Sequence, residues 1–344
     1  MEITFLLGNG FDIGFGLKTS YSNFYQYLSC MGETNEKINN NLIFKSIESA
    51  EQDNKIELWS DYELGIGKYT KNLGEDDKEK FIQDKLQMDR FLKEYLIQEN
   101  EKLNKIIEES PNILKNSISK IGECSRNDDV DLLKKMLSHF SYTSININPV
   151  SFNYTDTASL IFKEGTLSEE SKILGSPQNG NFIQINKPFY LHGTLSNEEM
   201  IIGVNDESQI ENELYAKDIE IKQLLVKNSL LSQAGRGNER EFNFIIEKSN
   251  IICIYGLSIG ASDSLYWKKV KERLLRENIY LIIYAYSQNM VADSIFLKTQ
   301  ERQKVKKQFY KYSGASGNQI QAIENKIIVE LNHTIFEPEK KLEE

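Results

Sequence analysis

The sequence predicts an α/β fold, in which a parallel sheet is covered by helices on both faces and interrupted by a helical insertion. Three observations lead to this prediction. Mostly apolar runs at 3–7, 148–152, 251–255 and 280–286 alternate with helical patterns. Runs without polar alternation are typical of strands buried on both faces, as in parallel sheets. Glycine or asparagine follows each of the first three runs, and ligands bind parallel sheets at the carboxyl ends of their strands.

Composition and charge exclude several classes of protein. The chain has 344 residues, which can bury a large core, and its formal net charge is -10. This acidic balance argues against nucleic acid and anionic membranes as partners. The three cysteines form no CxxC pair and the three histidines are scattered, so we expect no metal site. No apolar run of about 18 residues and no signal-peptide pattern occurs, so we expect a cytoplasmic protein without a membrane span.

The first predicted segment, residues 1–34, holds one strand and one helix. The apolar run at 3–7 stops at a glycine turn. A helix is expected over 20–28, and Ser20 suits the cap position before it. This segment should therefore supply the first strand of the sheet together with the turn at its carboxyl end.

A helical insertion is predicted for residues 35–140. These residues are rich in Lys, Glu, Asn, Leu and Ile, with apolar positions spaced by three and four, most clearly at 78–109 and 129–140. The insertion could form a lid or an oligomer interface, or it could be a solvated decoration. The sequence leaves these alternatives open.

Strands and helices alternate again over residues 141–330. A further strand is expected at 183–191 and a helix at 263–277. The chain after residue 290 is polar with a helical pattern, and it contains the strand-like run IIVEL at 327–331. Residues 331–344 are expected to be a C-terminal tail. The two flanking segments then form one discontinuous, Rossmann-like nucleotide-binding domain around the insertion.

The turn after the first strand is a candidate nucleotide-binding element. Glycines there let the backbone approach a diphosphate, and the start of the following helix favours negative charge. The pattern is GxG and not GxGxxG, because Ile13 stands at the third glycine position, and a tight connection alone would use the same glycines. No GxxxxGK[ST] pattern occurs, which argues against an ordinary P-loop. The candidate binding residues of this turn are Gly8, Asn9, Gly10, Phe11 and Asp12.

Of the three histidines, His192 is the candidate for acid–base chemistry. It stands at a predicted strand end beside Gly193, and a histidine in that place can exchange a proton near neutral pH. A histidine that only caps a turn fits the same pattern. His139 lies between Leu137 and Phe140 on an apolar helix face, which indicates a structural role.

The segment GLSIG at 256–260 allows two interpretations. It matches GxSxG between a predicted strand and a predicted helix, which is the context of a nucleophile elbow. Asp293 and His333 follow in the order Ser–Asp–His, so Ser258 could be the nucleophile of a serine hydrolase. Against this, a large helical block precedes Ser258, and His333 lies in a short polar tail. Alternatively, the segment is a glycine-rich turn whose Ser258 hydroxyl binds a phosphate or a ribose.

The segment WSDYE at 59–63 lies within the predicted insertion. Asp61 and Glu63 are two positions apart, so they would not share a helix face. The residues predict the start of a helix that is capped by Ser60.

These motifs together are similar to those of one known family. They cover the chain from end to end, apart from the variable helical middle. The matching pieces are LLGNGFD at 6–12, LKTSY at 17–21, WSDYE at 59–63, SFNYTD at 151–156, LHG at 191–193, YGLS at 255–258 and Ser262-Asp263. The chain resembles the bacterial abortive-infection AbiH family.

The order of the motifs also resembles that of the sirtuin-like NAD-binding fold, a three-layer α/β fold. This analogy implies Gly8 and Gly10 at the diphosphate and Asn153 at the nicotinamide ribose. The implied catalytic residues are His192, Asn153 and Asp156, and the binding residues beyond the first turn are Gly256, Ser258 and Asp263. The four-cysteine zinc module of sirtuin deacetylases is missing, and both turn motifs differ from theirs, which counts against protein deacetylation.

The resemblance implies an anti-phage protein that aborts infection, and the further analogy implies that it hydrolyses NAD as substrate without a metal. Asn153 would hold the attacking water, and Asp12 or Asp156 would stabilise the developing cation. Two alternatives remain, namely a serine hydrolase that uses Ser258 and a nucleotide-sensing or partner-binding module without turnover. The expected partners are the nucleotide, a phage-encoded trigger and a second copy of the chain.

Overall fold

The computed structural model describes the whole chain except residues 33–34, 53–61, 125, 139–143, 168–171, 174–175, 178–182, 197–199, 236, 277–278, 288–293 and 340–344. The described residues form two compact units, and each is assembled from separate stretches of the chain. The sheet unit comprises Met1–Gly16, Lys102–Leu191 and Glu239–Glu344, and the helical unit comprises Leu17–Glu101 and His192–Asn238. Residues of the predicted insertion therefore occur in both units.

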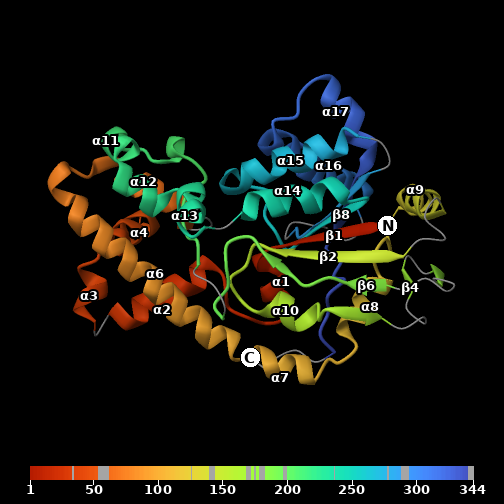
Figure 1. The fold of residues 1–344 in the computed structure, drawn as a ribbon, viewed down its shortest axis with the longest axis horizontal. Helices are drawn as coiled ribbons and strands as arrows, with labels where there is room; N and C mark the ends of the chain where they lie inside the picture. Colours follow the sequence, from red (N-terminus) through yellow and green to blue (C-terminus); the bar gives the residue numbers. More distant parts are fainter. Residues whose placement is uncertain are drawn as a thin grey trace. The chain divides into compact units, whose positions relative to one another are not determined.

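A mostly parallel sheet forms the centre of the sheet unit (Figure 1). Its strand order is β10-β9-β8-β1-β2-β6-β3, and β7 pairs with the last residues of β2. The pairing of β3 with β6 is antiparallel, and the other pairings of this sheet among the described residues are parallel. The strands are β1 (Glu2–Leu7), β2 (Ile145–Ser151), β3 (Gly165–Leu167), β6 (Ile183–Ile185), β7 (Phe189–Tyr190), β8 (Ile251–Tyr255), β9 (Tyr280–Ala285) and β10 (Ile327–Leu331). The predicted α/β class with a Rossmann-like sheet is confirmed.

Strand β1 pairs with β2 on one side and with β8 on the other, and the three strands end at the same position along the sheet. It is buried from Ile3 to Leu7, as expected for a strand covered on both faces. Leu7 is in register with Ser151 of β2 on one side and with Tyr255 of β8 on the other. The carboxyl ends of three strands therefore lie in one row, and the residues that follow them meet at one edge of the sheet.

The chain winds away from β1 in two directions. After β1 it enters β2 and then β6 on one side, and it later returns to β8 on the other side and continues to β9 and β10. The strand order consequently reverses between β1 and β8. In doubly wound sheets, such a reversal opens a crevice at the carboxyl ends of the two strands.

Helices cover both faces of the sheet (Figure 1). Trp267, Phe242 and Phe309 are fully buried between the sheet and the helices of one face. The helices of this face are α14 (Asn238–Lys248), α15 (Ser264–Leu274) and α16 (Ile295–Ser313). The opposite face carries α1 (Asn9–Gly14), α8 (Ile113–Ser119) and α10 (Thr157–Ile161). The remaining helices of the unit include α7 (Leu103–Glu108), α9 (Asn127–Ser138) and α17 (Asn318–Ile323).

Aromatic rings pack against β1 around Phe336. The ring centroid of Phe336 lies 5.6 Å from Phe5, 5.0 Å from Phe11, 5.4 Å from Phe162 and 5.0 Å from Tyr255. Most of these ring pairs are edge-on, which is the favourable arrangement for aromatic quadrupoles. Phe336 is 1% exposed although it lies in the predicted tail, so this late segment is part of the core.

Strand β10 is an edge strand at the end of a stretch that the sequence predicts to be polar and mostly helical. The expected helix after residue 290 is α16, and the strand-like run IIVEL forms β10. The run IIVEL is short, and Glu330 interrupts its apolar character. Pairing with β9 is what makes this run a strand, because the register places Ile327 beside Leu281.

The helical unit confirms the helical character predicted for 35–101, within its described residues. Its longest helix buries Phe81, Met88, Leu92 and Tyr95, which recur every three, four or seven residues along one face. The helices of the unit are α2 (Tyr21–Gly32), α3 (Glu36–Asn39), α4 (Leu42–Gln52), α5 (Tyr62–Tyr69), α6 (Lys78–Asn100), α11 (Glu213–Lys217), α12 (Ile219–Leu225) and α13 (Lys227–Gln233).

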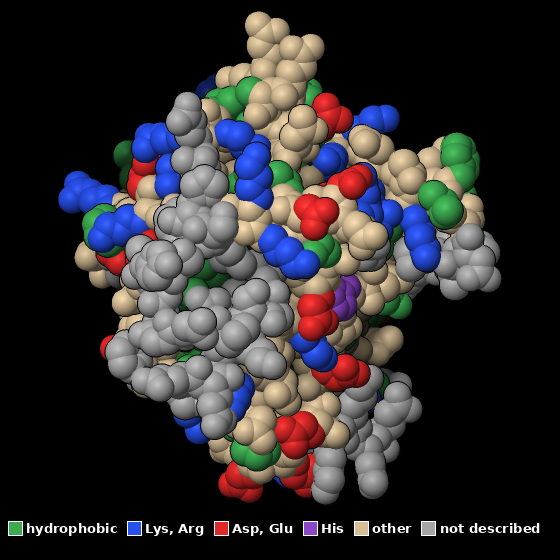
Figure 2. Space-filling view, turned by 90° about the vertical axis from the view of Figure 1, so that its right-hand side faces the viewer, with side chains coloured by type: hydrophobic (Ala, Val, Ile, Leu, Met, Phe, Trp, Pro, Cys, Tyr) green, Lys and Arg blue, Asp and Glu red, His purple; other side chains and the backbone are tan. Residues whose placement is uncertain are grey.

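Charge is unevenly distributed over the surface. Figure 2 shows one face, on whose upper part Lys and Arg side chains gather. Helix α16 alone carries six Lys or Arg residues and one acidic residue. The net charge of -10 therefore does not describe every part of the chain.

Replacing Phe336 by Ala should lower the free energy of unfolding by about 3–5 kcal/mol, because it leaves a cavity among four aromatic rings. Phe296→Ala is the matched control, since Phe296 is 68% exposed and its removal should change stability by less than about 0.5 kcal/mol. Urea unfolding followed by fluorescence measures both. Equal effects of the two substitutions would show that the segment after β10 is not part of the core.

Candidate functional site

The turns after β1 and β8 are joined by backbone hydrogen bonds. The Gly8 N–H donates to the Tyr255 carbonyl over 3.1 Å, and the Gly10 N–H donates to the Gly256 carbonyl over 2.6 Å. The Phe152 N–H donates to the Leu7 carbonyl over 2.9 Å and extends the row to β2. Backbone hydrogen bonds therefore connect the ends of β8, β1 and β2 along the candidate edge of the sheet.

The glycines of these turns are needed for close packing. A Cβ on Gly8 would lie 2.5 Å from the Leu257 Cα, and one on Gly10 would lie 2.7 Å from the Gly256 Cα. Gly256 has a φ of +64°, and its Cβ would lie 2.2 Å from the Phe11 backbone nitrogen. The close contact between the two turns is therefore sufficient to explain why these positions are glycine. The expected contact of the glycines with a diphosphate stays a prediction.

A buried polar group, which we call the Asp12 cluster, lies beside the first turn and consists of Asp12, Asn153, Thr155 and Thr157. The Thr155 hydroxyl donates to Asp12 Oδ2 over 2.7 Å, and the Thr157 hydroxyl donates to the Thr155 oxygen over 3.1 Å. The Asn153 Nδ2 donates to the Gly8 carbonyl over 2.9 Å. Helix α1 and the chain after β2 thus bring together Asp12 and Asn153, two residues that the sequence predicts for the site.

Burial controls the charge of Asp12. It raises the pKa of this carboxyl from 3.8 to about 6, while the hydrogen bond from Thr155 and the nearby polar groups of Thr157 and Asn153 act in the opposite direction. Among the described residues, Asp12 Oδ1 has no hydrogen-bond partner although it is shielded from solvent. A buried acceptor without a partner is unfavourable. The neutral, protonated form of Asp12 is therefore favoured more than in an exposed carboxyl.

Asp156 lies close to the Asp12 cluster but is less buried. It occupies the position before α10 and gives that helix no side-chain cap. The Tyr190 hydroxyl accepts from the Ser159 N–H over 3.0 Å and donates to the Ser159 hydroxyl over 2.9 Å. Burial raises the pKa of Tyr190 to about 12, and the charges of Asp156 and Asp12 both add to the rise. Two carboxylates therefore act on the same tyrosine.

The GLSIG segment forms an extended connection and not a sharp elbow. Five residues separate the end of β8 from the short turn and helix that begin at Ala261, and Ser258 is exposed. The two residues after Ser258 are fixed by side-chain hydrogen bonds. Gln308 donates to the Ile259 carbonyl over 2.7 Å, and Trp267 donates to the Gly260 carbonyl over 3.1 Å. Asp263 is buried at the start of α15.

The described residues do not assemble the Ser–His–Asp triad that the hydrolase alternative requires. No hydrogen bond joins Ser258 to His333 in this part of the chain, and the His333 ring lies beside Tyr284, with centroids 6.2 Å apart. Asp293 lies outside the described residues. A nucleophile elbow would place the serine in a sharp strand-to-helix turn, which is not the local structure here.

His192 belongs to the helical unit, whereas the other predicted site residues belong to the sheet unit. It follows Leu191, whose N–H donates to the Ser151 carbonyl of β2 over 2.9 Å. Its own carbonyl accepts from the Ile201 N–H over 2.9 Å. Burial, together with the positive charge of Lys227, holds the pKa of His192 well below its ordinary value. The imidazole is therefore neutral at pH 7, as a proton acceptor requires.

The described residues include no group of three or more His, Cys, Asp or Glu side chains arranged to hold a metal ion. In the same parts of the chain, every helix is too short or too polar to cross a bilayer.

The family model for bacteriophage abortive infection AbiH matches residues 4–286. The chain belongs to the AbiH family. No curated protein matches it. The match begins in β1 and ends just beyond β9, so it covers the strand-end residues described above, and it supports a role of this AbiH protein in defence against phage by abortive infection.

Sequence reasoning missed several polar residues of this AbiH protein. Thr155 stands in the FNYTD motif, so its place in the Asp12 cluster could have been found from that motif. Tyr62 and Glu63 stand in the WSDYE motif, which predicts only a helix start. Helix α5 does begin at Tyr62, and Ser60, its predicted cap, lies outside the described residues.

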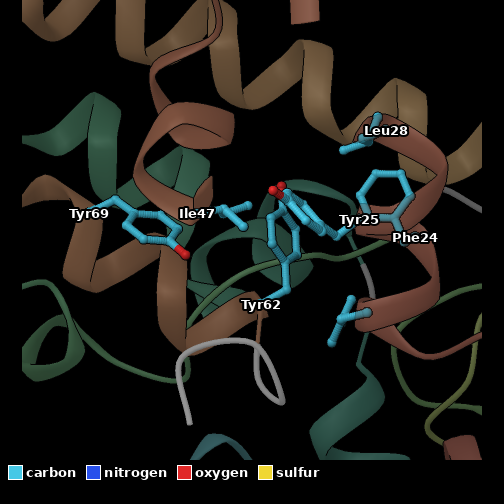
Figure 3. Close-up of a pocket in the computed structure, with 7 residues that line it drawn as sticks. Phe24, Tyr25, Leu28, Ile47, Tyr62 and Tyr69 are labelled. Atoms are coloured by element: carbon cyan, nitrogen blue, oxygen red, sulfur yellow. The ribbon is translucent and has the colours of Figure 1, made fainter. Parts of the chain in front are cut away.

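Tyr62 also contributes to an aromatic pocket within the helical unit, which Figure 3 shows. Its hydroxyl is buried without a hydrogen-bond partner among the described residues, and burial raises its pKa well above the ordinary value. The pocket is lined by Tyr21, Phe24, Tyr25, Leu28, Ile47, Tyr62 and Tyr69. No site residue was predicted here.

Gly10→Ala should lower the free energy of unfolding by about 1–3 kcal/mol, because the new methyl group must displace the backbone of the turn after β8. Gly14→Ala is the matched control in the same helix, since nothing lies within 4 Å of its added Cβ. It should leave stability unchanged or raise it by up to about 1 kcal/mol. Urea unfolding compares the two. A neutral Gly10→Ala would mean that the two turns do not touch.

Asp12→Asn should change how stability depends on pH. The pKa of Asp12 is higher in the folded chain than in the unfolded one, so its contribution is full below about pH 4 and is lost as pH rises through 6. The shift of about two pH units corresponds to about 3 kcal/mol. Relative to the unmodified protein, Asp12→Asn should therefore gain stability between pH 4 and pH 7. A difference that does not vary with pH would contradict the burial of an ionisable group at this position.

Proposed function

We propose that this AbiH protein binds NAD at the carboxyl edge of its sheet and hydrolyses it, so that the infected cell is deprived of NAD. The observation that carries the proposal is the reversal of strand order between β1 and β8. With β6 and β2 on one side and β9 and β10 on the other, the order is that of the doubly wound sheets that bind dinucleotides at the reversal. The glycine turn after β1 occupies the place of the diphosphate-binding turn in those sheets.

The Asp12 cluster supports a sugar ligand at this edge. Asp12 Oδ1 is an acceptor without a partner among the described residues, and the hydroxyl groups of a ribose are suitable donors for it. Gly8 and Gly10 support the proposal indirectly, because their close packing brings the turns after β1 and β8 near enough for one dinucleotide to touch both. In this proposal Gly256, Ser258 and Asp263 face the adenosine side.

The proposed reaction breaks the bond between C1′ of the ribose and the nicotinamide nitrogen. Nicotinamide leaves as a neutral base with the bonding electrons, the oxygen of water bonds to C1′, and one proton of that water is released. The transition state carries positive charge on the ribose, which a carboxylate stabilises. Asp12 and Asp156 are the candidates for this role, and His192 is the candidate that accepts the proton.

Asn153 is the residue proposed to hold the attacking water. Its Nδ2 is engaged by the Gly8 carbonyl, which determines the direction of the amide. In this proposal the Asn153 Oδ1 accepts a hydrogen bond from the attacking water. A water held in a determined direction supplies the orientation that the reaction needs.

Purified protein should release nicotinamide from NAD, and Asn153→Ala should reduce the rate by about 10²–10⁴-fold, as for the loss of a residue that handles the attacking water. Asn146→Ala is the matched control on β2, because its amide bonds Glu2 at the opposite end of the strand. It should leave the rate within about twofold. Chromatography of nicotinamide and ADP-ribose measures both.

Three outcomes would decide against this proposal. Tight binding of NAD without release of nicotinamide, also with phage components present, would favour the sensing module. Loss of activity on an ester substrate in Ser258→Ala would favour the serine hydrolase. The same loss of rate in Asn153→Ala and Asn146→Ala would remove Asn153 from the chemistry.

A further inference from the structure

Two neighbouring helices of the sheet unit are strongly basic, although the whole chain has a net charge of -10. Helix α15 carries four Lys or Arg residues and one acidic residue, and α16 carries six and one. The two helices pack against each other on one face of the sheet (Figure 1). Positive charge is therefore concentrated on one pair of helices of an acidic protein.

The outer side of α16 presents a row of lysines. On the inner side, Arg302 donates to the Val329 carbonyl of β10 over 3.1 Å. Lys306 donates to the Glu324 carbonyl, in the turn before β10, over 2.9 Å. The exposed lysines lie on the other side of the helix, and their spacing of three and four residues places them along one line. They are Lys304, Lys307 and Lys311.

Two lysines of α15 extend this row. Arg276 forms an ion pair with Glu247 of α14, and Arg273 donates to the backbone carbonyl just after α14 over 2.7 Å. That side of α15 therefore faces α14. Lys268 and Lys271 lie about half a turn away around the helix, on the side of α16, and are exposed and partly exposed. We call these two residues and the three lysines of the α16 row the lysine face.

Few acidic groups neutralise the lysine face. From residue 302 to residue 313, α16 contains no Asp or Glu. Glu301 lies 3.6 Å from Lys304, whose side chain stays 71% exposed, and such an exposed pair is weak. The acidic residue of α15, Glu272, pairs with Lys269 instead. At about 0.1 M salt, charges more than about 10 Å apart are largely screened, so acidic residues elsewhere in the chain do not cancel this local charge.

The residues of the α16 row favour a nucleic-acid duplex as the partner. Every exposed residue between 299 and 311 is Thr, Gln or Lys. This stretch therefore offers no exposed apolar side chain for insertion into a lipid layer and no exposed ring on which a single strand could stack its bases.

The length of the row also suits a duplex. The row spans about 10 Å, since each helical residue rises about 1.5 Å. One strand of a duplex places a phosphate about every 3.4 Å along its axis, so the row matches about three phosphates.

We propose that the lysine face binds the phosphate backbone of a nucleic-acid duplex. The five ammonium groups replace counterions along the backbone, and phosphates carry no sequence information, so binding does not depend on base sequence. The acidic balance of the whole chain argues against nucleic acid as a partner, and the lysine face is the surface where that expectation does not hold. The proposal is independent of NAD hydrolysis.

Fluorescence anisotropy of a labelled DNA duplex of about 20 base pairs, titrated with the full chain, tests the proposal. Five phosphate contacts give a slope of about -4.5 for the logarithm of the affinity against the logarithm of the salt concentration. The affinity should therefore fall about 10²–10³-fold between about 50 mM and about 200 mM salt. A second duplex of unrelated sequence should bind within about twofold of the first.

Replacing the three lysines of the α16 row together, as Lys304→Gln, Lys307→Gln and Lys311→Gln, should weaken binding at about 50 mM salt by about tenfold or more. It should also reduce the size of the salt slope by about 3, because about three phosphate contacts are lost. Arginine at the same three positions keeps the charge and should keep the affinity. If the glutamine variant fails to fold, Lys268→Gln with Lys271→Gln should reduce the slope by about 2.

Lys134→Gln, Lys163→Gln and Lys187→Gln together are the matched control. They remove the same charge from exposed lysines on other elements of the sheet unit, and they should change the affinity by less than about twofold, because none of the three belongs to the lysine face. An equal loss in the control and in the α16 variant would overturn the proposal, as would the absence of duplex binding at about 50 mM salt.

A membrane is the competing partner, because Ile295 and Phe296 at the start of α16 are 82% and 68% exposed. Vesicles of phosphatidylcholine with phosphatidylserine test this alternative. The proposal expects Phe296→Ser to leave duplex binding unchanged. Binding of the vesicles but not of the duplex, with loss of vesicle binding in Phe296→Ser, would overturn the proposal in favour of a membrane.

Discussion

Contact between the backbones of two turns determines the functional edge of the sheet. The Gly10 N–H reaches the Gly256 carbonyl over 2.6 Å, and there is no room for a side chain on either residue. Strands β1 and β8 start the two halves of the doubly wound sheet, so this contact joins the halves at their carboxyl ends. The carbonyl of Gly8, on the same turn, is the acceptor that orients Asn153. Close packing of the two turns therefore requires glycine at these positions, whether or not a ligand binds there.

The two units treat buried charge in different ways. In the helical unit, the ammonium groups of Lys85 and Lys227 each have a carboxylate within 2.6 Å. In the sheet unit, Asp12 has two hydroxyl groups in a chain on one oxygen and no described partner on the other. Paired charges can stay ionised in a protein interior, whereas an unpaired carboxylate takes up a proton more readily. Burial for this reason raises the pKa of Asp12 to about 6.

The sequence predicted the strands well where burial is continuous. The runs that became β8 and β9 are apolar without a break, and the run that became β1 is apolar except for Thr4. Their short length and the turn residues after them favour buried strands over helices. The run IIVEL is strand-like, but the sequence did not place it in the sheet, because a five-residue run that contains Glu330 does not show which strand it will pair with. Phe336 was predicted to lie in a tail, because the residues near it in the sequence do not show that it packs against four aromatic rings.

For the candidate site too, the sequence predicted some residues and could not predict their partners. The motifs GNGFD and FNYTD identified Asp12 and Asn153, because small and polar residues directly after a buried strand must lie at its carboxyl end. Their hydrogen-bond partners could not be predicted, since Asp12 and Thr155 are separated by 143 residues. Glu63 and Lys227 are 164 residues apart, and nothing in a helical pattern shows which charged residue will be buried or beside what.

The sequence by itself therefore determined the α/β class, the two strand-end motifs and the AbiH membership, because these depend on local runs of residues. Only the tertiary structure decided that the glycines pack against each other, that Asp12 keeps one oxygen without a described partner, and that burial, together with the charge of Lys227, lowers the pKa of His192. The reason is physical: hydrogen bonds, close contacts and the loss of solvent around a charge depend on distances in space. Those distances exist only after distant segments of the chain have packed together.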